Sequence, residues 1–199
     1  MNSQKYYLHP TAEVSSDAKI GNNTKIWHQA QVREFAHIGK NCVIAKNVYI
    51  DHHVTLGNNC RIQNNSSLYF GSTLKDNVFI GPHVVLANDH LPRAVNSQNK
   101  PKSPSDWTVG NIKIESGASI GAGSVIVPSF NIGRYALIGA GSVVTKDVPD
   151  FALVYGNPAK IHGYVCICTE KIDISKGQFT CPKCQRRYQI THSKVNLLI

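Results

Sequence analysis

Four cysteines towards the end of the chain are spaced as metal ligands. Cys166 and Cys168 form a Cys-x-Cys pair, and Cys181 and Cys184 form a Cys-x-x-Cys pair a short distance further on. In a reducing compartment such pairs favour tetrahedral zinc over disulfides. Because four protein ligands leave no open coordination position, we expect a structural zinc and not a catalytic one.

Four histidines in the middle of the chain are candidates for proton transfer, since imidazole takes up a proton near neutral pH. They are His83, His90 and the neighbouring pair His52 and His53. Shortly after His90 comes Arg93, whose guanidinium is suited to a carboxylate or a diphosphate. The alternative for Arg93 is an ordinary solvated side chain.

The elements that position these side chains follow from a repeat of six residues. Leu, Ile or Val occupies all twenty of the following positions, in two series: Leu8, Val14, Ile20, Ile26, Val32, Ile38, Ile44, Ile50, Leu56, Ile62, Leu68, Leu74, Ile80 and Leu86, then Ile114, Ile120, Ile126, Ile132, Ile138 and Val144. The fourth residue after each is small or β-branched, except at His90 and Phe130.

This pattern predicts short strands that close a three-sided prism. Two residues separated by one position face the same side of a strand, so the small and the aliphatic residue both point inward. Gly, Asn or Asp beside the aliphatic residue permits the positive φ of a corner. Cys42 and Cys60 fall in the small inward column, so we expect them to be core residues. His90 stands where a small residue is usual, which places it outside the prism.

The repeat is interrupted once. The step from Leu86 to Ile114 is long and is not a multiple of six. The intervening stretch, 88–110, is polar and rich in Pro and Asn, and it predicts a loop ejected from one corner. Long loops in a compact repeat are usually functional.

Charge and hydropathy exclude several classes. The formal net charge is +9, but no basic cluster with interleaved aromatic residues marks a nucleic-acid binder. Such a charge also suits small anionic ligands. No apolar run is long enough to cross a bilayer, so no membrane partner is expected. Met1 to His9 lack the order of a signal peptide, so we expect a cytoplasmic protein.

Strict hexads over roughly residues 8–160 resemble the hexapeptide-repeat acyltransferases. The resemblance implies an all-β fold, a left-handed parallel β-helix of about 20 hexads in roughly 7 coils, with one long inserted loop and a small zinc-ribbon-like tail. We place the β-helix domain at 1–163, including loop 88–110, and the tail at 164–199. The family also implies a homotrimer whose active sites lie at subunit interfaces.

Within that family, the run from Asn88 to Ala94 resembles N-acetyltransferases that act on nucleotide-linked 3-amino sugars, among them those for UDP-2-acetamido-3-amino-2,3-dideoxyglucuronate and for dTDP-3-amino-3,6-dideoxyhexoses. The residue that matches Asn88 sits at their reacting centre, and no protein base is evident. This implies a direct attack of the amine on acetyl-CoA, with His90 as the alternative catalytic residue. The substrate-binding candidates are Trp27, His28, Gln63, Asn64, Tyr69 and Arg93.

Two of these candidates have simpler explanations. Trp27 follows an aliphatic column residue and should point outward, either to stack on a base or to pack against a subunit. Asn64 falls at a turn, where asparagine is common for conformational reasons.

The segment around Asn157 and Pro158 resembles the closing segment of CoA-dependent hexapeptide enzymes. The resemblance implies that Gly123 and Ala140, at corners of the last coils, leave room for pantetheine. Lys146 and Lys160 would then meet the phosphates of CoA, or else remain solvated. The sequence leaves two alternatives to N-acetyl transfer, a sugar O-acetyltransferase that uses His90 as base and a non-catalytic trimeric scaffold.

Overall fold

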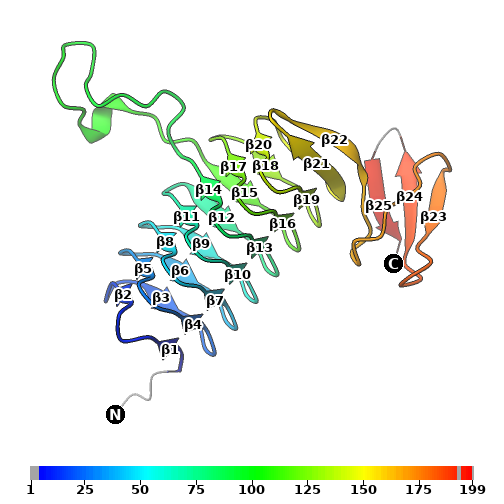
Figure 1. Cartoon of the computed structure of the whole chain (residues 1–199), viewed down its shortest axis with the longest axis horizontal. Helices are drawn as coiled ribbons and strands as arrows, with labels where there is room; N and C mark the ends of the chain where they lie inside the picture. Colours follow the sequence, from blue (N-terminus) through cyan, green and yellow to red (C-terminus); the bar gives the residue numbers. More distant parts are fainter. Residues whose placement is uncertain (1–4, 192–193, 199) are drawn as a thin grey trace.

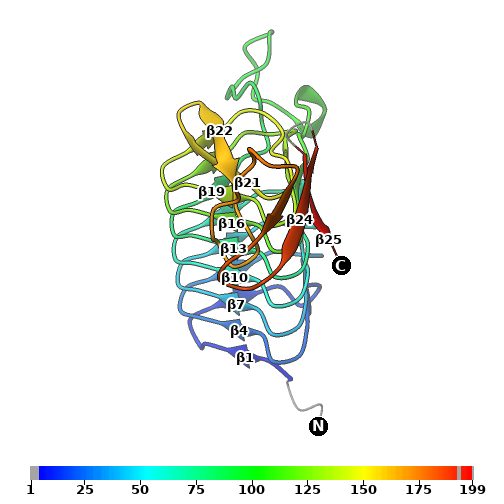
Figure 2. The same ribbon diagram turned by 90° about the vertical axis from the view of Figure 1, so that its right-hand side faces the viewer.

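The chain winds into a triangular prism bounded by three parallel β-sheets (Figure 1). The computed structural model describes residues 5–191 and 194–198. As far as the twentieth strand, successive strands belong to sheets A, B and C in rotation, so a strand pairs with the third strand after it, as Tyr7 does with Lys25. Figure 2 shows the strands of sheet A stacked one above another.

Most strands have only two residues. Sheet A contains β1 (Tyr7–Leu8), β4 (Lys25–Ile26), β7 (Val43–Ile44), β10 (Arg61–Ile62), β13 (Phe79–Ile80), β16 (Ser119–Ile120), β19 (Leu137–Ile138), β21 (Ala152–Gly156) and the antiparallel β22 (Ala159–Tyr164). Sheet B contains β2 (Glu13–Val14), β5 (Gln31–Val32), β8 (Tyr49–Ile50), β11 (Ser67–Leu68), β14 (Val85–Leu86), β17 (Val125–Ile126) and β20 (Val143–Val144). Sheet C contains β3 (Lys19–Ile20), β6 (His37–Ile38), β9 (Thr55–Leu56), β12 (Ser72–Leu74), β15 (Ile112–Ile114) and β18 (Asn131–Ile132).

The predicted inward columns form the core. From Ile26 to Val144 the aliphatic residues at the ends of the strands are buried, and the preceding residue of each two-residue strand faces outward. The small residues Ala30, Ala36, Cys42 and Cys60 are also fully buried, so both cysteines are core residues as predicted. The predicted β-helix is confirmed as a parallel β-solenoid, consistent with the left-handed form, and its sheet A has eight parallel strands in place of the roughly seven coils expected.

The three corners are built from residues in the left-handed region. At the corner between sheets C and A, the side-chain amides of Asn23, Asn41, Asn59 and Asn77 form a ladder with donor–acceptor distances of 3.2, 3.2 and 3.0 Å. All four have φ between 57° and 63°. Asparagine tolerates this conformation, and the ladder satisfies its amides at the same time. The coils therefore stack in register along this edge.

A small antiparallel sheet follows the prism. It consists of β23 (Gln178–Thr180), β24 (Arg187–Thr191) and β25 (Lys194–Leu198), and it lies beyond β22 at the end of the prism (Figure 1). The division of the chain into domains at residue 163 remains a prediction. The part of the chain that the structure describes contains no helix long and apolar enough to cross a bilayer.

Candidate active site

The predicted inserted loop is confirmed, and it leaves the prism at the corner between sheets B and C. It connects β14 to β15, contains a short 3-10 helix, η1 (Pro104–Asp106), and projects away from the prism (Figure 1). Its two ends are joined, since the Gly110 N–H donates to the Asn88 carbonyl over 3.0 Å and Asp89 bridges Val109. Asn88 therefore lies at the base of the loop.

The candidate residues of the loop are accessible. Asn88 is half-buried, while His90 and Arg93 are exposed. His90 lies outside the prism, as predicted, with its Nε2 3.0 Å from the Ser129 hydroxyl. The guanidinium of Arg93 donates to the Pro92 carbonyl over 3.1 Å. His90 and Arg93 are therefore accessible to solvent, and Asn88 is partly so.

Below the loop, the same corner carries a hydrogen-bonded group that the sequence analysis missed. The carboxylate of Asp51, only 8% exposed, accepts hydrogen bonds from the Tyr49 hydroxyl at 3.0 Å, the His52 N–H at 2.8 Å and the Phe70 N–H at 3.2 Å. The guanidinium of Arg33 lies 3.7 Å from it. We call these five residues the Asp51 cluster. Burial raises the pKa of the Tyr49 hydroxyl above its ordinary value.

Tyr69, one of the predicted binding residues, packs on this cluster. Its ring lies 5.6 Å from that of Tyr49 and it is 37% exposed. Arg33, Asp51 and Tyr69 occupy the same position in three successive coils. A reading of the sequence in steps of three hexads would have found this column and its position below the loop.

The other predicted substrate-binding residues lie on the opposite edge of sheet B. Trp27 and His28 form an aromatic group at the A/B corner, where the Trp27 ring lies 5.2 Å from that of Tyr7 and His28 stacks on His9 at 3.5 Å. Desolvation lowers the pKa of His9, and the neighbouring His28 lowers it further. Trp27 is 37% exposed, so its predicted outward orientation is confirmed.

Two coils further on, Gln63 and Asn64 occupy the same A/B corner. The Asn64 side-chain oxygen accepts a hydrogen bond from the Lys46 N–H at 3.2 Å, so it has a structural role in the turn. The side-chain amide of Asn65 lies 3.3 Å from Nε2 of His83. Within one chain, the predicted substrate-binding residues therefore form two groups, with sheet B between them.

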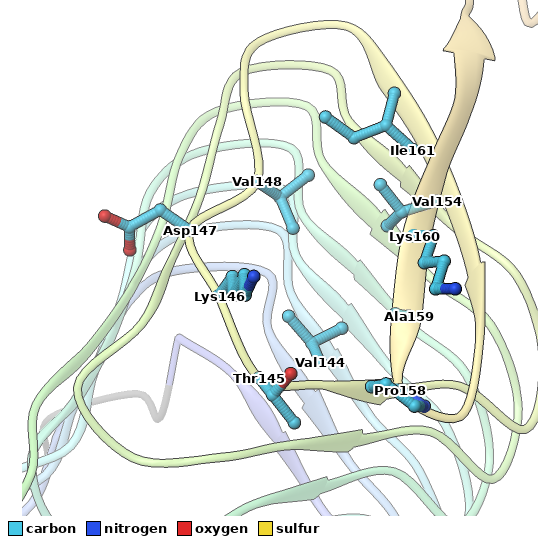
Figure 3. A pocket seen from close by; sticks show the side chains of 10 residues that line it. All are labelled: Val144, Thr145, Lys146, Asp147, Val148, Val154, Pro158, Ala159, Lys160 and Ile161. Carbon is cyan, nitrogen blue, oxygen red and sulfur yellow. The ribbon is translucent and has the colours of Figure 1, made fainter.

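Three of the six residues predicted to bind CoA meet at the end of the prism. Lys146, Pro158 and Lys160 line a cavity of about 330 Å³, with the inward valines Val144 and Val154 among its other walls (Figure 3). The cavity lies between the last coil and the β21–β22 hairpin. An apolar wall flanked by two ammonium groups suits a ligand with both apolar and phosphate parts.

The other three residues predicted to bind CoA lie outside that cavity. Asn157 is in the turn of the hairpin, before a cis peptide bond to Pro158. Gly123 and Ala140 are at the A/B corners of the last coils, as predicted, and therefore on the other side of sheet B from Lys146. A Cβ added to Gly123 would meet nothing within 4 Å, so this corner is open.

The four tail cysteines come together. Their sulfur atoms all lie within 4.8 Å of one another, and three neighbouring pairs are 3.3 to 3.5 Å apart. A disulfide needs about 2.05 Å, whereas four sulfurs at about 2.3 Å from one zinc lie roughly 3.8 Å apart. The arrangement thus fits four ligands around a shared ion. Hydrogen bonding from the Arg186 backbone lowers the pKa of Cys184 to about 6, while burial raises the pKa of Cys166 to about 12.

Comparison with known proteins supports the repeat directly. The family model for bacterial transferase hexapeptide (six repeats) matches residues 17–52, 35–69 and 111–146. The chain therefore carries hexapeptide repeats of this family in two segments, residues 17–69 and 111–146. It is 53% identical over 90 residues to a dTDP-3-amino-3,6-dideoxy-alpha-D-galactopyranose 3-N-acetyltransferase of Aneurinibacillus thermoaerophilus, a match that covers 45% of the chain and 46% of that relative. The chain thus matches about half the length of this curated relative.

Two solved structures resemble the prism. PerB of Caulobacter crescentus, solved with CoA and GDP-perosamine, is 26% identical with a TM-score of 0.50, and the match covers 79% of this chain and 57% of PerB. A hexapeptide-repeat acetyltransferase of Vibrio cholerae, solved with acetyl coenzyme A, is 26% identical with a TM-score of 0.56. That match covers 64% of this chain and 70% of the other.

Proposed function

We propose that this protein transfers the acetyl group of acetyl-CoA to the 3-amino group of a nucleotide-linked amino sugar, in the cytoplasm and for the synthesis of a surface polysaccharide. The observation that carries the proposal is the 53% identity over 90 residues to a dTDP-3-amino sugar N-acetyltransferase. The polar residues at the base of a long loop, beside a prism of hexapeptide coils, support it.

The reaction needs little from the protein beyond orientation and charge stabilisation. The free amine attacks the thioester carbonyl, a C–N bond forms, the C–S bond breaks, and the thiolate of CoA takes the proton that the nitrogen loses. The amide of Asn88 orients the amine or donates a hydrogen bond to the carbonyl oxygen as negative charge develops. Arg93 and the exposed Tyr69 bind the sugar or its diphosphate from the same corner.

We propose that acetyl-CoA lies along the last coils. Pantetheine runs past the open corners at Gly123 and Ala140, while Lys146 and Lys160 meet the phosphates of CoA, with Asn157 and Pro158 in the hairpin turn beside them. The cavity that Lys146 and Lys160 line supports the placement of the phosphates. Gly123 and Ala140 lie on the other side of sheet B from Lys146, so they would contact pantetheine from a neighbouring protomer whose A/B corner faces this B/C corner.

A homotrimer completes the site. In one chain the predicted substrate-binding residues occupy two edges of sheet B. The two groups would come together if the A/B corner of one protomer faced the B/C corner of its neighbour. The projecting loop carries large exposed apolar side chains, Leu91 at 79%, Val95 at 38% and Trp107 at 39%. Apolar side chains held away from the body of their own chain suit contact with a second copy.

A sugar O-acetyltransferase is the second candidate, favoured by the exposed imidazole of His90 at the loop base. An assay of CoA release, with the product identified by mass spectrometry, against UDP- and dTDP-linked 3-amino sugars and their 3-hydroxy counterparts separates the candidates. We expect N-acetylated product from amino sugars only. Product from hydroxy sugars alone would favour the O-acetyltransferase, and absence of CoA binding would favour the scaffold.

We further propose that Cys166, Cys168, Cys181 and Cys184 hold a structural zinc ion. The convergence of their sulfur atoms within 4.8 Å supports this. When bound, zinc would cross-link the segment that follows β22 to the turn between β23 and β24.

Metal analysis of the purified protein tests the zinc site. We expect one equivalent of zinc per chain, and none in the Cys181→Ser, Cys184→Ser double variant, since a pair of ligands is then lost. The Cys42→Ser variant is the matched control, because that buried cysteine lies in the prism core. A protein without zinc, whose tail thiols all react with a thiol reagent, would contradict the site.

A further inference from the structure

We infer that Tyr188 couples the cysteine cluster to the last coil of the prism, so that metal in the tail holds the β21–β22 hairpin in place. Since that hairpin walls the donor-side cavity, metal loading would also set the affinity for acetyl-CoA. The first step rests on the proposed zinc site, and the second also rests on the proposed function.

On the tail side, Tyr188 is in direct contact with one of the proposed metal ligands, Cys166. Its side chain is fully buried, and its hydroxyl donates to the Cys166 sulfur at 3.1 Å. The same hydroxyl accepts a hydrogen bond from the Ile167 N–H at 3.1 Å. The phenol therefore orients a ligand sulfur and the backbone that carries it, which is the function of an outer-shell residue at a metal site.

On the prism side, the ring of Tyr188 packs against the last coil. It meets Phe151 edge-on at 5.5 Å, and Phe151 in turn stacks on Tyr135 at 5.6 Å. Phe151 is 2% exposed, and its carbonyl accepts a hydrogen bond from the Val165 N–H at 2.8 Å. These aromatic rings form an unbroken series of contacts from the C/A corner of the prism to the cysteine cluster.

The hairpin lies between the cluster and the cavity. Strand β22 begins beside the cavity, where Pro158, Lys160 and Ile161 contribute to the walls, and it ends at Tyr164, just before Cys166. Among the described strands of sheet A, β22 pairs only with β21, so it is an edge strand. An edge strand with one partner opens easily unless it is held at an end.

The hydrophobic core of the tail is too small to fix the end of β22 by burial alone. Its buried apolar side chains include Ile172, Tyr188 and Val195, a core far smaller than that of the prism. Modules of this size usually need a metal or a cross-link to stay folded. Metal binding and docking on Phe151 are then thermodynamically linked, because each requires the folded tail.

Hydrogen exchange measured by mass spectrometry tests the coupling without an activity assay. In the wild-type protein, removal of zinc with a strong chelator should speed exchange in peptides from residues 152–165, while peptides from the coils at residues 43–62 stay protected. Unchanged exchange in 152–165 after complete zinc removal would overturn the inference.

Zinc affinity, measured by competition with a chromogenic chelator, tests Tyr188 itself. Tyr188→Phe keeps the ring and removes the hydroxyl, so zinc affinity should fall about 10- to 100-fold. Tyr135→Phe is the matched control, since that ring also stacks on Phe151 but on the prism side of it, and its affinity should equal wild type. Equal affinities in both variants would refute the role of Tyr188, as would a protein that binds no zinc.

A kinetic comparison distinguishes this inference from the proposed function. Zinc removal should raise the KM for acetyl-CoA more than the KM for the amino sugar. If the protein acetylates no amino sugar, the proposed function fails, but the exchange and affinity measurements still decide the coupling. If acetylation proceeds with an unchanged KM for acetyl-CoA, the link to the donor cavity fails alone.

Discussion

Replacement of Asn88 with alanine is expected to lower kcat by about 100- to 1000-fold, the loss seen when one donor to a developing oxyanion is removed. Asn88 lies at the base of the loop, where its carbonyl is bonded to Gly110 and its side chain is half-buried. The backbone contact survives the substitution, so the loop should keep its position. Steady-state kinetics with an accepted amino sugar measure the effect.

The His90→Ala variant provides the comparison. Because the amine needs no protein base in the proposed mechanism, this variant should retain kcat within about tenfold of wild type, whereas loss of a general base costs about 100- to 10,000-fold. If Asn88→Ala keeps near wild-type turnover while His90→Ala abolishes it, a general-base mechanism replaces ours.

Excision of residues 88–109 is expected to abolish turnover while leaving the prism folded. Without this segment, Ile114 follows Leu86 by one hexad, so the repeat runs on without a break. Ala87, Gly110 and Asn111 then form an ordinary corner. Ile112 already pairs with Ser72, so no strand changes register.

Activity and fold are measured separately on this variant. Turnover should fall by at least the roughly 100- to 1000-fold assigned to Asn88, while far-UV circular dichroism and the thermal midpoint stay close to wild type. The proposed homotrimer should also be weakened, which sedimentation velocity would detect, because the exposed Leu91 and Trp107 leave with the loop. An active variant would show that the loop does not form the site.

The fold could be predicted from sequence because its determinants are local. Each aliphatic column residue is followed by its corner residues and its small partner within one hexad, so the strands and corners between Ile26 and Ile80 need no knowledge of distant contacts. The loop was predictable for the same reason, since an interruption in a strict period is visible by itself.

The site was less predictable because its contacts cross coils. Asp51 is bonded to Phe70 in the next coil and lies near Arg33 in the preceding one. Such pairs become visible in the sequence only when it is read in steps of three hexads, which is how the coils stack. Lys146 and Lys160 share a cavity because the chain reverses at the β21–β22 hairpin, which breaks the period. The contact of Tyr188 with Phe151 joins the tail to the last coil, beyond the final hexad residue Val144, so the hexads carried no information about it.

The stacking of parallel strands gives the coils a fixed spacing along the axis of the prism. Neighbouring strands in a sheet are about 4.8 Å apart. Trp27 and Gln63 are two coils apart, so they stand roughly 10 Å from each other along the axis. That span exceeds a hexose and approaches the length of a sugar joined to its diphosphate. Insertion or loss of one whole coil between two such residues would change their separation by one fixed increment of about 4.8 Å, which is a simple way to match ligands of different length.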